Sequence, residues 1–173
     1  KNVYIKASIY NHKSINGNII PIYFLDTDIP ENDEEDRAIT LRLYSGDDKH
    51  RIRQEAILGL GGMKLLEILN QNSIEKYHMN EGHCSFLVLD LLRKYKGNIE
   101  EVRSKCHFTT HTPVPAGHDQ FDFKLVKDIL GDLVSDDIAL PSMENNKFHM
   151  TELGLHFSKT ANGVSKLHGD VAQ

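Results

Sequence analysis

Two short segments of this sequence gather the side chains best suited to ligand recognition. The first, HMNEGHCSF (residues 78–86), places Asn80, Glu81 and His83 around Gly82, where an extended stretch gives way to a helical one. A carboxylate accepts hydrogen bonds and an imidazole donates or accepts them, as sugar hydroxyls require. The alternative is that Asn80 and Glu81 cap the following helix, and that His83 is a buried histidine with satisfied hydrogen bonds. Both interpretations stay open at this point.

The second segment is CHFTTHTPVPAGHDQF (residues 106–121), in which Thr110, His111 and Thr112 come directly before Pro113 and Pro115. Prolines after a strand restrict the backbone, so the polar groups before them are held in one geometry. Ligands of open parallel sheets bind beyond the carboxyl ends of the strands, where both segments are expected to lie. The alternative for His111 is that it orders the loop through backbone hydrogen bonds.

Metal, thiol and phosphate-loop chemistry are weaker readings of the same residues. Zinc spacings such as C-x-x-C and H-E-x-x-H are absent, and no Cys and His pair is placed for nucleophilic catalysis, so we predict no metal site. The glycine cluster of residues 59–62 lacks the phosphate-loop pattern and lies within a helical period, which favours close helix packing. The residues of metal-ligand type are His78, His83, Cys84, Cys106, His107, His111 and His118.

Composition limits the class of protein. The 173 residues, 39% of them hydrophobic, are enough for one ordinary core. A net charge of -5 with scattered Lys and Arg argues against nucleic acid as a partner, and no apolar run reaches the length of a membrane span. Two cysteines are too few for a disulfide framework, so we expect reduced thiols and a cytoplasmic location.

The spacing of apolar residues predicts an α/β fold with a mostly parallel sheet and flanking helices. Two strands (3–9 and 19–25) are joined by a turn at Asn16, Gly17 and Asn18, and the acidic segment 26–37 is predicted to be a solvated surface loop. The remaining expected elements are a helix at 50–69, extended pieces at 74–79 and 106–110, helices at 83–96, 99–104 and 123–130, a polar stretch through Asn146, a final helix from about Thr151, and a last segment that reads as a helix cut in mid-course.

Several blocks, in order along nearly the whole chain, resemble the α-glucan phosphorylase family, particularly its shorter bacterial and archaeal branch. The resemblance implies a GT-B glycosyltransferase of two Rossmann-like domains. Residues 1–173 would be a single partial domain, a fragment of the N-terminal one. The blocks are IPIYFLDTD (20–28), RLYSGDD (42–48), RIRQE (51–55), YHMNEGHCSF (77–86), FTTHTPVPAGHDQF (108–121) and ANGVSKLHG (161–169).

The resemblance also implies a reaction, in which a terminal α-1,4-linked glucosyl unit of a glucan is transferred to inorganic phosphate to give glucose 1-phosphate. Pyridoxal 5'-phosphate would be the cofactor, held in a C-terminal domain. The blocks for the cofactor lysine and for phosphate binding are missing from this sequence. We therefore predict no catalytic and no cofactor-binding residue here, and an inactive fragment.

The implied sugar contacts are specific. His111 matches the family histidine that hydrogen-bonds the 6-hydroxyl of the transferred glucose, and Thr112 is its neighbour. The remaining substrate-site candidates by resemblance are Asn80, Glu81 and His83 of the N-E-G-H block, and Asp47 and Asp48 in the segment where longer members carry a gate loop. A second hypothesis is a stand-alone glucan-binding or interaction module without turnover, although the absence of Trp argues against a strong aromatic sugar platform.

Overall fold

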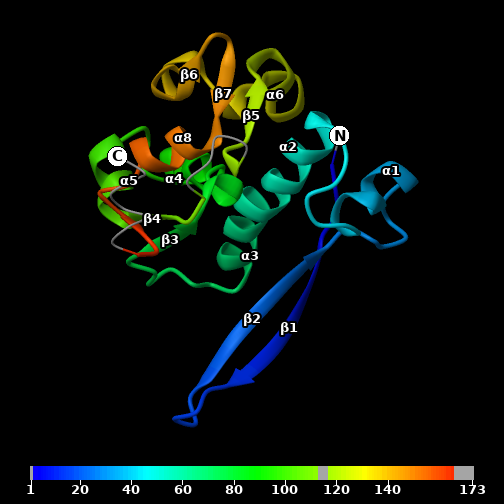
Figure 1. Cartoon of the computed structure of the whole chain (residues 1–173). Coiled ribbons are helices and arrows are strands. Elements are labelled where there is room, and N and C mark those ends of the chain that lie inside the picture. The colour runs from blue at the N-terminus through cyan, green and yellow to red at the C-terminus, as the bar shows by residue number, and fades with distance from the viewer. Residues whose placement is uncertain (1, 113–116, 166–173) are drawn as a thin grey trace.

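A three-stranded parallel sheet forms the centre of the protein, which a computed structural model describes over residues 2–112 and 117–165. The strand order is β3 (Tyr77–Asn80), β4 (Cys106–Thr110), β8 (Thr160–Gly163), with β4 in the middle. Two helices, α4 (Leu87–Lys94) and α5 (Ile99–Lys105), connect β3 to β4. The prediction of an α/β fold with a parallel sheet and flanking helices is confirmed (Figure 1).

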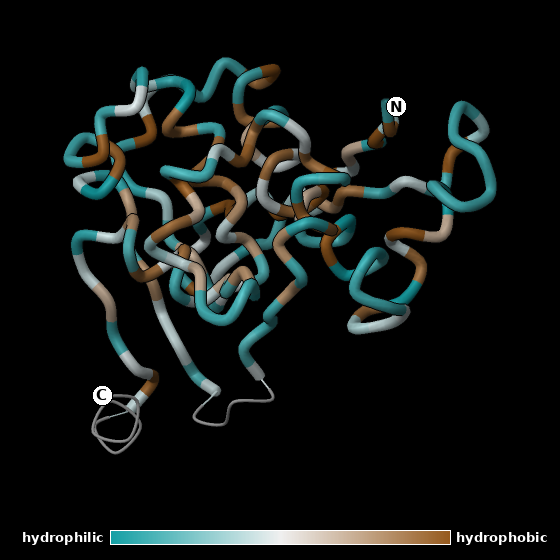
Figure 2. Tube along the Cα trace, turned by 90° about the horizontal axis from the view of Figure 1, so that it is seen from above, coloured by the Kyte–Doolittle hydropathy of each residue, from teal (hydrophilic) through white to brown (hydrophobic). Residues whose placement is uncertain are grey.

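The two faces of this sheet differ. Tyr77, Met79, Cys106 and Phe108 are buried on one face, in the same apolar core as α4. Figure 2 shows hydrophobic segments running through the body of the molecule and hydrophilic segments at most of its outer turns. The other face carries the alternate side chains, which are polar, because successive residues of a strand point to opposite sides. His78, Asn80, His107 and Thr109 lie on it.

The predicted helix of residues 50–69 is confirmed, with an irregular turn at its middle. It runs through α2 (Asp48–Ala56), a π-helical turn η2 (Ile57–Gly61) and α3 (Gly62–Ile68). At Gly59 an added Cβ would lie 2.8 Å from the backbone nitrogen of Leu87 and 3.0 Å from the carbonyl oxygen of Cys84. The glycine therefore allows the helix to approach the start of α4 closely, as the packing interpretation predicts.

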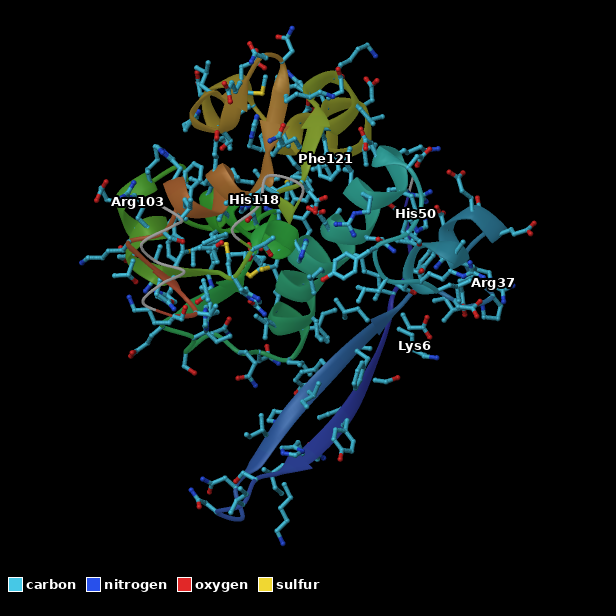
Figure 3. The ribbon with its side chains drawn as sticks, in the orientation of Figure 1. Lys6, Arg37, His50, Arg103, His118 and Phe121 are labelled. Atoms are coloured by element: carbon cyan, nitrogen blue, oxygen red, sulfur yellow. The ribbon has the colours of Figure 1, made fainter. Side chains whose placement is uncertain are left out.

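The two N-terminal strands form the predicted hairpin, β1 (Lys6–Lys13) and β2 (Ile19–Asp26), which are antiparallel. Its turn contains Gly17 at a φ of +83°, a conformation that glycine adopts without steric cost. The hairpin projects from the body, and Lys6 lies where the two meet (Figures 1 and 3). The strands are exposed on both faces although β2 is almost entirely apolar.

The acidic segment is more ordered than predicted. Asp33 caps a short helix, α1 (Glu34–Arg37), which is followed by the 3₁₀ turn η1 (Ala38–Thr40). Asp36 is buried at 1% exposure and forms an ion pair with Arg53 of α2. The interpretation of this whole segment as a solvated loop is therefore wrong at Asp36, because a cation 17 residues away neutralises its charge.

The last third combines a predicted helix with unpredicted pieces. Helix α6 (Phe123–Leu130) is confirmed, and α8 (Met150–His156) is the final helix that was predicted. The stretch through Asn146 that was predicted to be polar contains η5 (Gly131–Leu133), α7 (Asp136–Ala139), η6 (Leu140–Ser142) and the strand β6 (Met143–Glu144). The strand β7 (Lys147–His149) follows this stretch and pairs with both β6 and β5 (Gln120–Asp122) in a second, antiparallel sheet. Such short strands carry little periodicity, and β8 was missed for the same reason.

Pro113, Pro115 and the segment 166–173 lie outside the described residues, so the predicted loop stiffening and the truncated last helix stay predictions. Among the residues that are described, no helix is both long and apolar enough to cross a membrane.

Candidate functional site

The two segments singled out in the sequence meet at the carboxyl ends of β3 and β4. Asn80 pairs in register with Thr109, and the backbone N–H of Glu81 donates to the carbonyl oxygen of Thr109 at 2.9 Å. The next residues of both strands therefore leave the sheet side by side. The imidazole Nε2 of His111 then forms a hydrogen bond with Oδ1 of Asn80. Parallel pairing is the physical reason why these side chains, 31 positions apart, come together.

The Asn80 contact has a consequence for the His111 ring. An amide oxygen can only accept, so Nε2 carries the hydrogen of that bond, and in a neutral imidazole Nδ1 is then the acceptor. Both side chains are exposed. The pair thus offers an oriented acceptor nitrogen at the edge of the sheet.

Glu81 turns away from solvent. It is buried at 4% exposure, and its Oε1 accepts hydrogen bonds from the backbone N–H groups of His111 at 2.5 Å and Thr112 at 2.8 Å. The hydroxyl of Thr110 also donates to this carboxylate at 3.4 Å. The turn η3 (Gly82–Cys84) that follows has no side-chain cap, so the helix-capping alternative for Glu81 is wrong.

His83 belongs to a second, partly buried cluster of charged groups. Its Nδ1 lies 3.3 Å from Oδ2 of Asp119, and its ring lies 5.4 Å from the ring of Tyr44. The guanidinium of Arg51 contacts the same oxygen of Asp119 at 2.6 Å and Oε1 of Glu55 at 3.1 Å. His83 is only partly buried, at 27% side-chain exposure, so it does not match the alternative of a buried histidine; charged neighbours hold its side chain, and it borders a groove.

Burial and mutual repulsion give the two carboxyl groups of this cluster different charges. Loss of hydration and the nearby Asp119 charge raise the pKa of Glu55 to about 10, against the opposing charge of Arg51. Burial also acts to raise the pKa of Asp119, but hydrogen bonds with His83 and Glu55 and the charge of Arg51 lower it to about 2. We conclude that Asp119 carries the negative charge and Glu55 keeps a proton at neutral pH.

A groove of about 710 Å³ connects the two clusters. Its walls combine apolar side chains from β2 and η2 with polar groups from α2 and the end of β3. His111 does not line the groove, but it contacts Asn80, which does. The polar and aromatic lining includes Tyr44, Arg51, Gln54, Glu55, His78, Asn80 and His83.

The two aspartates proposed from the gate-loop resemblance have other surroundings. Asp47 caps α2, where its carboxylate accepts from the backbone N–H of His50 at 2.9 Å. Asp48 is exposed in the first turn of that helix. Neither lines the groove. Their role in substrate binding stays a prediction.

Within the described residues, two groups of side chains could hold a cation by proximity. Glu55, His83 and Asp119 place one ligand atom each within 4.8 Å of one another, as do Glu144, His149 and Glu152. In the first group Arg51 already contacts both carboxyl groups, so a metal ion would have to displace its guanidinium.

Most of the residues of metal-ligand type have other partners. His78 contacts the hydroxyl of Thr109 at 2.6 Å, His107 lies between Thr160 and Asn162, and His118, at the centre of Figure 3, contacts Thr151. Burial raises the pKa of the Cys84 thiol, and raises that of Cys106 to about 12. Neither cysteine is a reactive thiolate at neutral pH.

Sequence reasoning missed Tyr44, Arg51, Glu55 and Asp119. The last three form the charged cluster around His83, and Arg51 lies 5.2 Å from the ring centre of Tyr44. The blocks RLYSGDD, RIRQE and FTTHTPVPAGHDQF contain these four residues, but the spacing of Arg51 and Glu55 resembles an ordinary surface ion pair on a helix. Their common partner, Asp119, lies 68 residues beyond Arg51.

Known proteins give a consistent family relationship. A scan against protein-family models finds no match. The chain is 38% identical to a glycogen phosphorylase of Mycobacterium tuberculosis over 89% of its own length, and 38% identical to a maltodextrin phosphorylase of Thermococcus litoralis over 92%. A glycogen phosphorylase of Aquifex aeolicus is 36% identical over 87%. The chain spans only about a fifth of the length of these relatives, between 20% and 24%. It is therefore homologous to one segment of the glycogen and maltodextrin phosphorylases, as its sequence blocks predict.

Proposed function

We propose that this chain is the sugar-contacting segment of an α-glucan phosphorylase, within a Rossmann-like N-terminal domain of GT-B type. The parent enzyme would transfer a terminal α-1,4-linked glucosyl unit to inorganic phosphate, and its partners would be the glucan, phosphate and glucose 1-phosphate. Three observations support the proposal: the homology, the parallel sheet, and the position of the site beyond the carboxyl ends of its strands.

The observation that carries the proposal is the contact between His111 and Asn80. Because Asn80 fixes the hydrogen on Nε2, Nδ1 is left to accept a hydrogen bond from a sugar hydroxyl. By resemblance that hydroxyl is the one on carbon 6. Asn80 therefore sets both the direction and the tautomer of the His111 ring.

Cofactor chemistry is assigned outside these 173 residues. Pyridoxal 5'-phosphate would supply the acid and base function through its phosphate, and its lysine belongs to a sequence block that this chain lacks. The purified chain is accordingly expected to bind no pyridoxal phosphate and to release no glucose 1-phosphate from maltodextrin. Stoichiometric cofactor absorbance in the chain would contradict this assignment.

The proposal can be tested in a chimera, in which this chain replaces the matching segment of the Thermococcus litoralis maltodextrin phosphorylase. We expect synthesis from glucose 1-phosphate, and His111→Ala should lower kcat/KM by roughly ten- to a hundredfold. A loop-ordering histidine would also cause such a loss, so the decisive comparison uses 6-deoxyglucose 1-phosphate. The unsubstituted chimera should use this analogue poorly, whereas the His111→Ala chimera should hardly distinguish the two sugars. An unchanged preference in the variant would show that His111 does not contact the 6-hydroxyl.

A further inference from the structure

Glu81 is counted among the sugar contacts by resemblance, but its geometry points elsewhere. We propose that Glu81 is a positioning residue: its carboxylate holds the backbone amides of His111 and Thr112, and thereby places the His111 imidazole against Asn80. The consequence for sugar binding rests on the function proposed above, whereas the clamp itself rests only on the contacts of this chain.

One carboxylate oxygen of Glu81 binds two consecutive backbone amides. Oε1 of Glu81 accepts from His111 at 2.5 Å and from Thr112 at 2.8 Å, while the hydroxyl of Thr110 donates to the same carboxylate. Successive N–H groups that converge on a point form a small anion-binding concavity. Hydrogen bonds to an ionised acceptor are about twice as strong as neutral ones, so this contact can fix a backbone that no strand pairing holds.

The carboxylate is also inaccessible to a ligand. Glu81 is 4% exposed, and it is not among the residues that line the groove, although its neighbour Asn80 is. A sugar hydroxyl would have to displace a backbone amide to reach Oε1. Asn80 therefore contacts the tip of the His111 ring, and Glu81 holds the His111 backbone.

A further observation concerns the backbone of Glu81 itself. Its φ of +64° and ψ of -179° lie in a strained region of backbone conformation that is almost restricted to glycine. The backbone N–H of Glu81 donates a hydrogen bond to the carbonyl oxygen of Thr109, and the Glu81 carboxylate accepts one from the backbone N–H of His111. Glu81 is therefore held at both its backbone and its side chain. A strained conformation persists only where its surroundings over-determine it. Here the strain turns the carboxylate toward the neighbouring strand end.

Amide hydrogen exchange, measured by NMR on the ¹⁵N-labelled 173-residue chain, tests the clamp directly. In Glu81→Gln we expect the His111 and Thr112 amides to exchange roughly ten- to a hundredfold faster, because a neutral amide replaces the ionised acceptor. The His111 ring signals should shift as its contact with Asn80 is lost. Asn80→Ala should shift the ring signals but leave both amides protected. Glu67→Gln, which removes an exposed carboxylate on α3, is the charge-matched control and should change neither.

A merely structural role for Glu81 would accelerate exchange throughout β3 and β4, and would not single out these two amides. If Glu81→Gln does not fold, Glu81→Asp keeps the charge but withdraws the oxygens by one methylene, and the same two amides should again be the ones that accelerate. Unchanged exchange at both amides overturns the clamp.

The chimera separates this inference from the function on which it rests. Glu81→Gln should reduce the preference for glucose 1-phosphate over its 6-deoxy analogue, and Glu67→Gln should not. Accelerated exchange with an unchanged sugar preference would support the clamp and overturn the role of His111 in sugar binding.

Discussion

Replacing Glu55 with glutamine should cost little stability at neutral pH, although Glu55 forms a buried contact with Arg51. Burial and the Asp119 charge raise the pKa of Glu55 from 4.5 to about 10, so the folded protein holds this carboxyl in its neutral form. Glutamine has the same shape, accepts from Arg51 through its carbonyl oxygen and donates through its amide. We expect the free energy of unfolding to change by less than about 1 kcal/mol near pH 5, and Glu55→Gln to be the more stable protein at pH 7, because the unfolded wild-type chain gains free energy by ionising Glu55 and glutamine cannot ionise. If Glu55 were ionised, loss of its charge would cost roughly 3 to 5 kcal/mol.

The pH dependence of this difference gives a second, independent readout. Because the folded pKa is raised, the stabilisation from the Glu55 proton is fully present below pH 4.5 and is lost as the pH rises toward about 10. The slope has a ceiling of about 1.4 kcal/mol per pH unit, or about 4 kcal/mol between pH 5 and pH 8. This pH-dependent contribution to the free energy of unfolding is absent in Glu55→Gln, because glutamine does not ionise.

Urea unfolding followed by circular dichroism at pH 5, 6, 7 and 8 would measure both quantities. All other ionisable groups are common to both proteins, so the difference between the two curves isolates position 55. Asp119, whose pKa is lowered from 3.8 to about 2, contributes stability that is lost only below this window. The reasoning is refuted if Glu55→Gln loses several kcal/mol at pH 7, or if the difference between the two proteins does not vary with pH.

Three further predictions concern packing, ion pairing and metal. Gly59→Ala should destabilise the chain by roughly 1 to 3 kcal/mol in thermal or urea unfolding, because the added Cβ would meet the backbone of Leu87 and Cys84. Gly62→Ala, whose Cβ would meet nothing within 4 Å, should instead stabilise the chain by roughly 0.5 to 1 kcal/mol. Equal effects of the two substitutions would contradict the packing argument. Asp36→Asn should cost roughly 1 to 3 kcal/mol, because it removes the buried counter-charge of Arg53 and leaves the exposed Glu35 as its carboxylate partner, and Asp28→Asn, which breaks an exposed pair with Arg37, should cost less than about 1 kcal/mol. Elemental analysis should find well under one metal per chain, and chelators should leave unfolding unchanged, since Arg51 occupies the carboxyl groups of the Glu55, His83 and Asp119 cluster; one zinc per chain that is lost together with the fold would reverse this conclusion.

The parts of the fold that could be predicted are those with a long, regular pattern. The helix of residues 50–69 and α6 have clear apolar periodicity, and β2 is a short apolar run bounded by polar residues. The strands β6, β7 and β8 have two to four residues each, too few for an alternating pattern to be distinguished from a loop. They exist because partner strands pair with them, and that is a tertiary effect.

The meeting of the two polar segments could be predicted, but the function of each side chain in them could not. Carboxyl ends of parallel strands lie at one edge of a sheet, so a topology argument places Asn80 near His111 from sequence alone. The direction in which the Glu81 side chain points depends on its backbone φ of +64°, and no pattern of residues in the sequence predicts such a conformation for a glutamate. The carboxylate that looks most suited to a sugar hydroxyl is for this reason turned toward the backbone.

The charged cluster shows the same limit for electrostatics. On a helical wheel Arg51 and Glu55 resemble a solvated i,i+4 pair worth a few tenths of a kcal/mol. Asp119 changes that interpretation, because it brings a second carboxyl group to the same guanidinium. Its negative charge, together with burial, favours the protonated form of Glu55. His83 borders this cluster on one side and the groove on the other. A change in the charge of Glu55 would therefore be felt at the His83 ring. Because the pKa of Glu55 is raised to about 10, the His83 ring signals of the unsubstituted protein, followed by NMR to pH 10 and above, should report this ionisation, whereas those of Glu55→Gln should not.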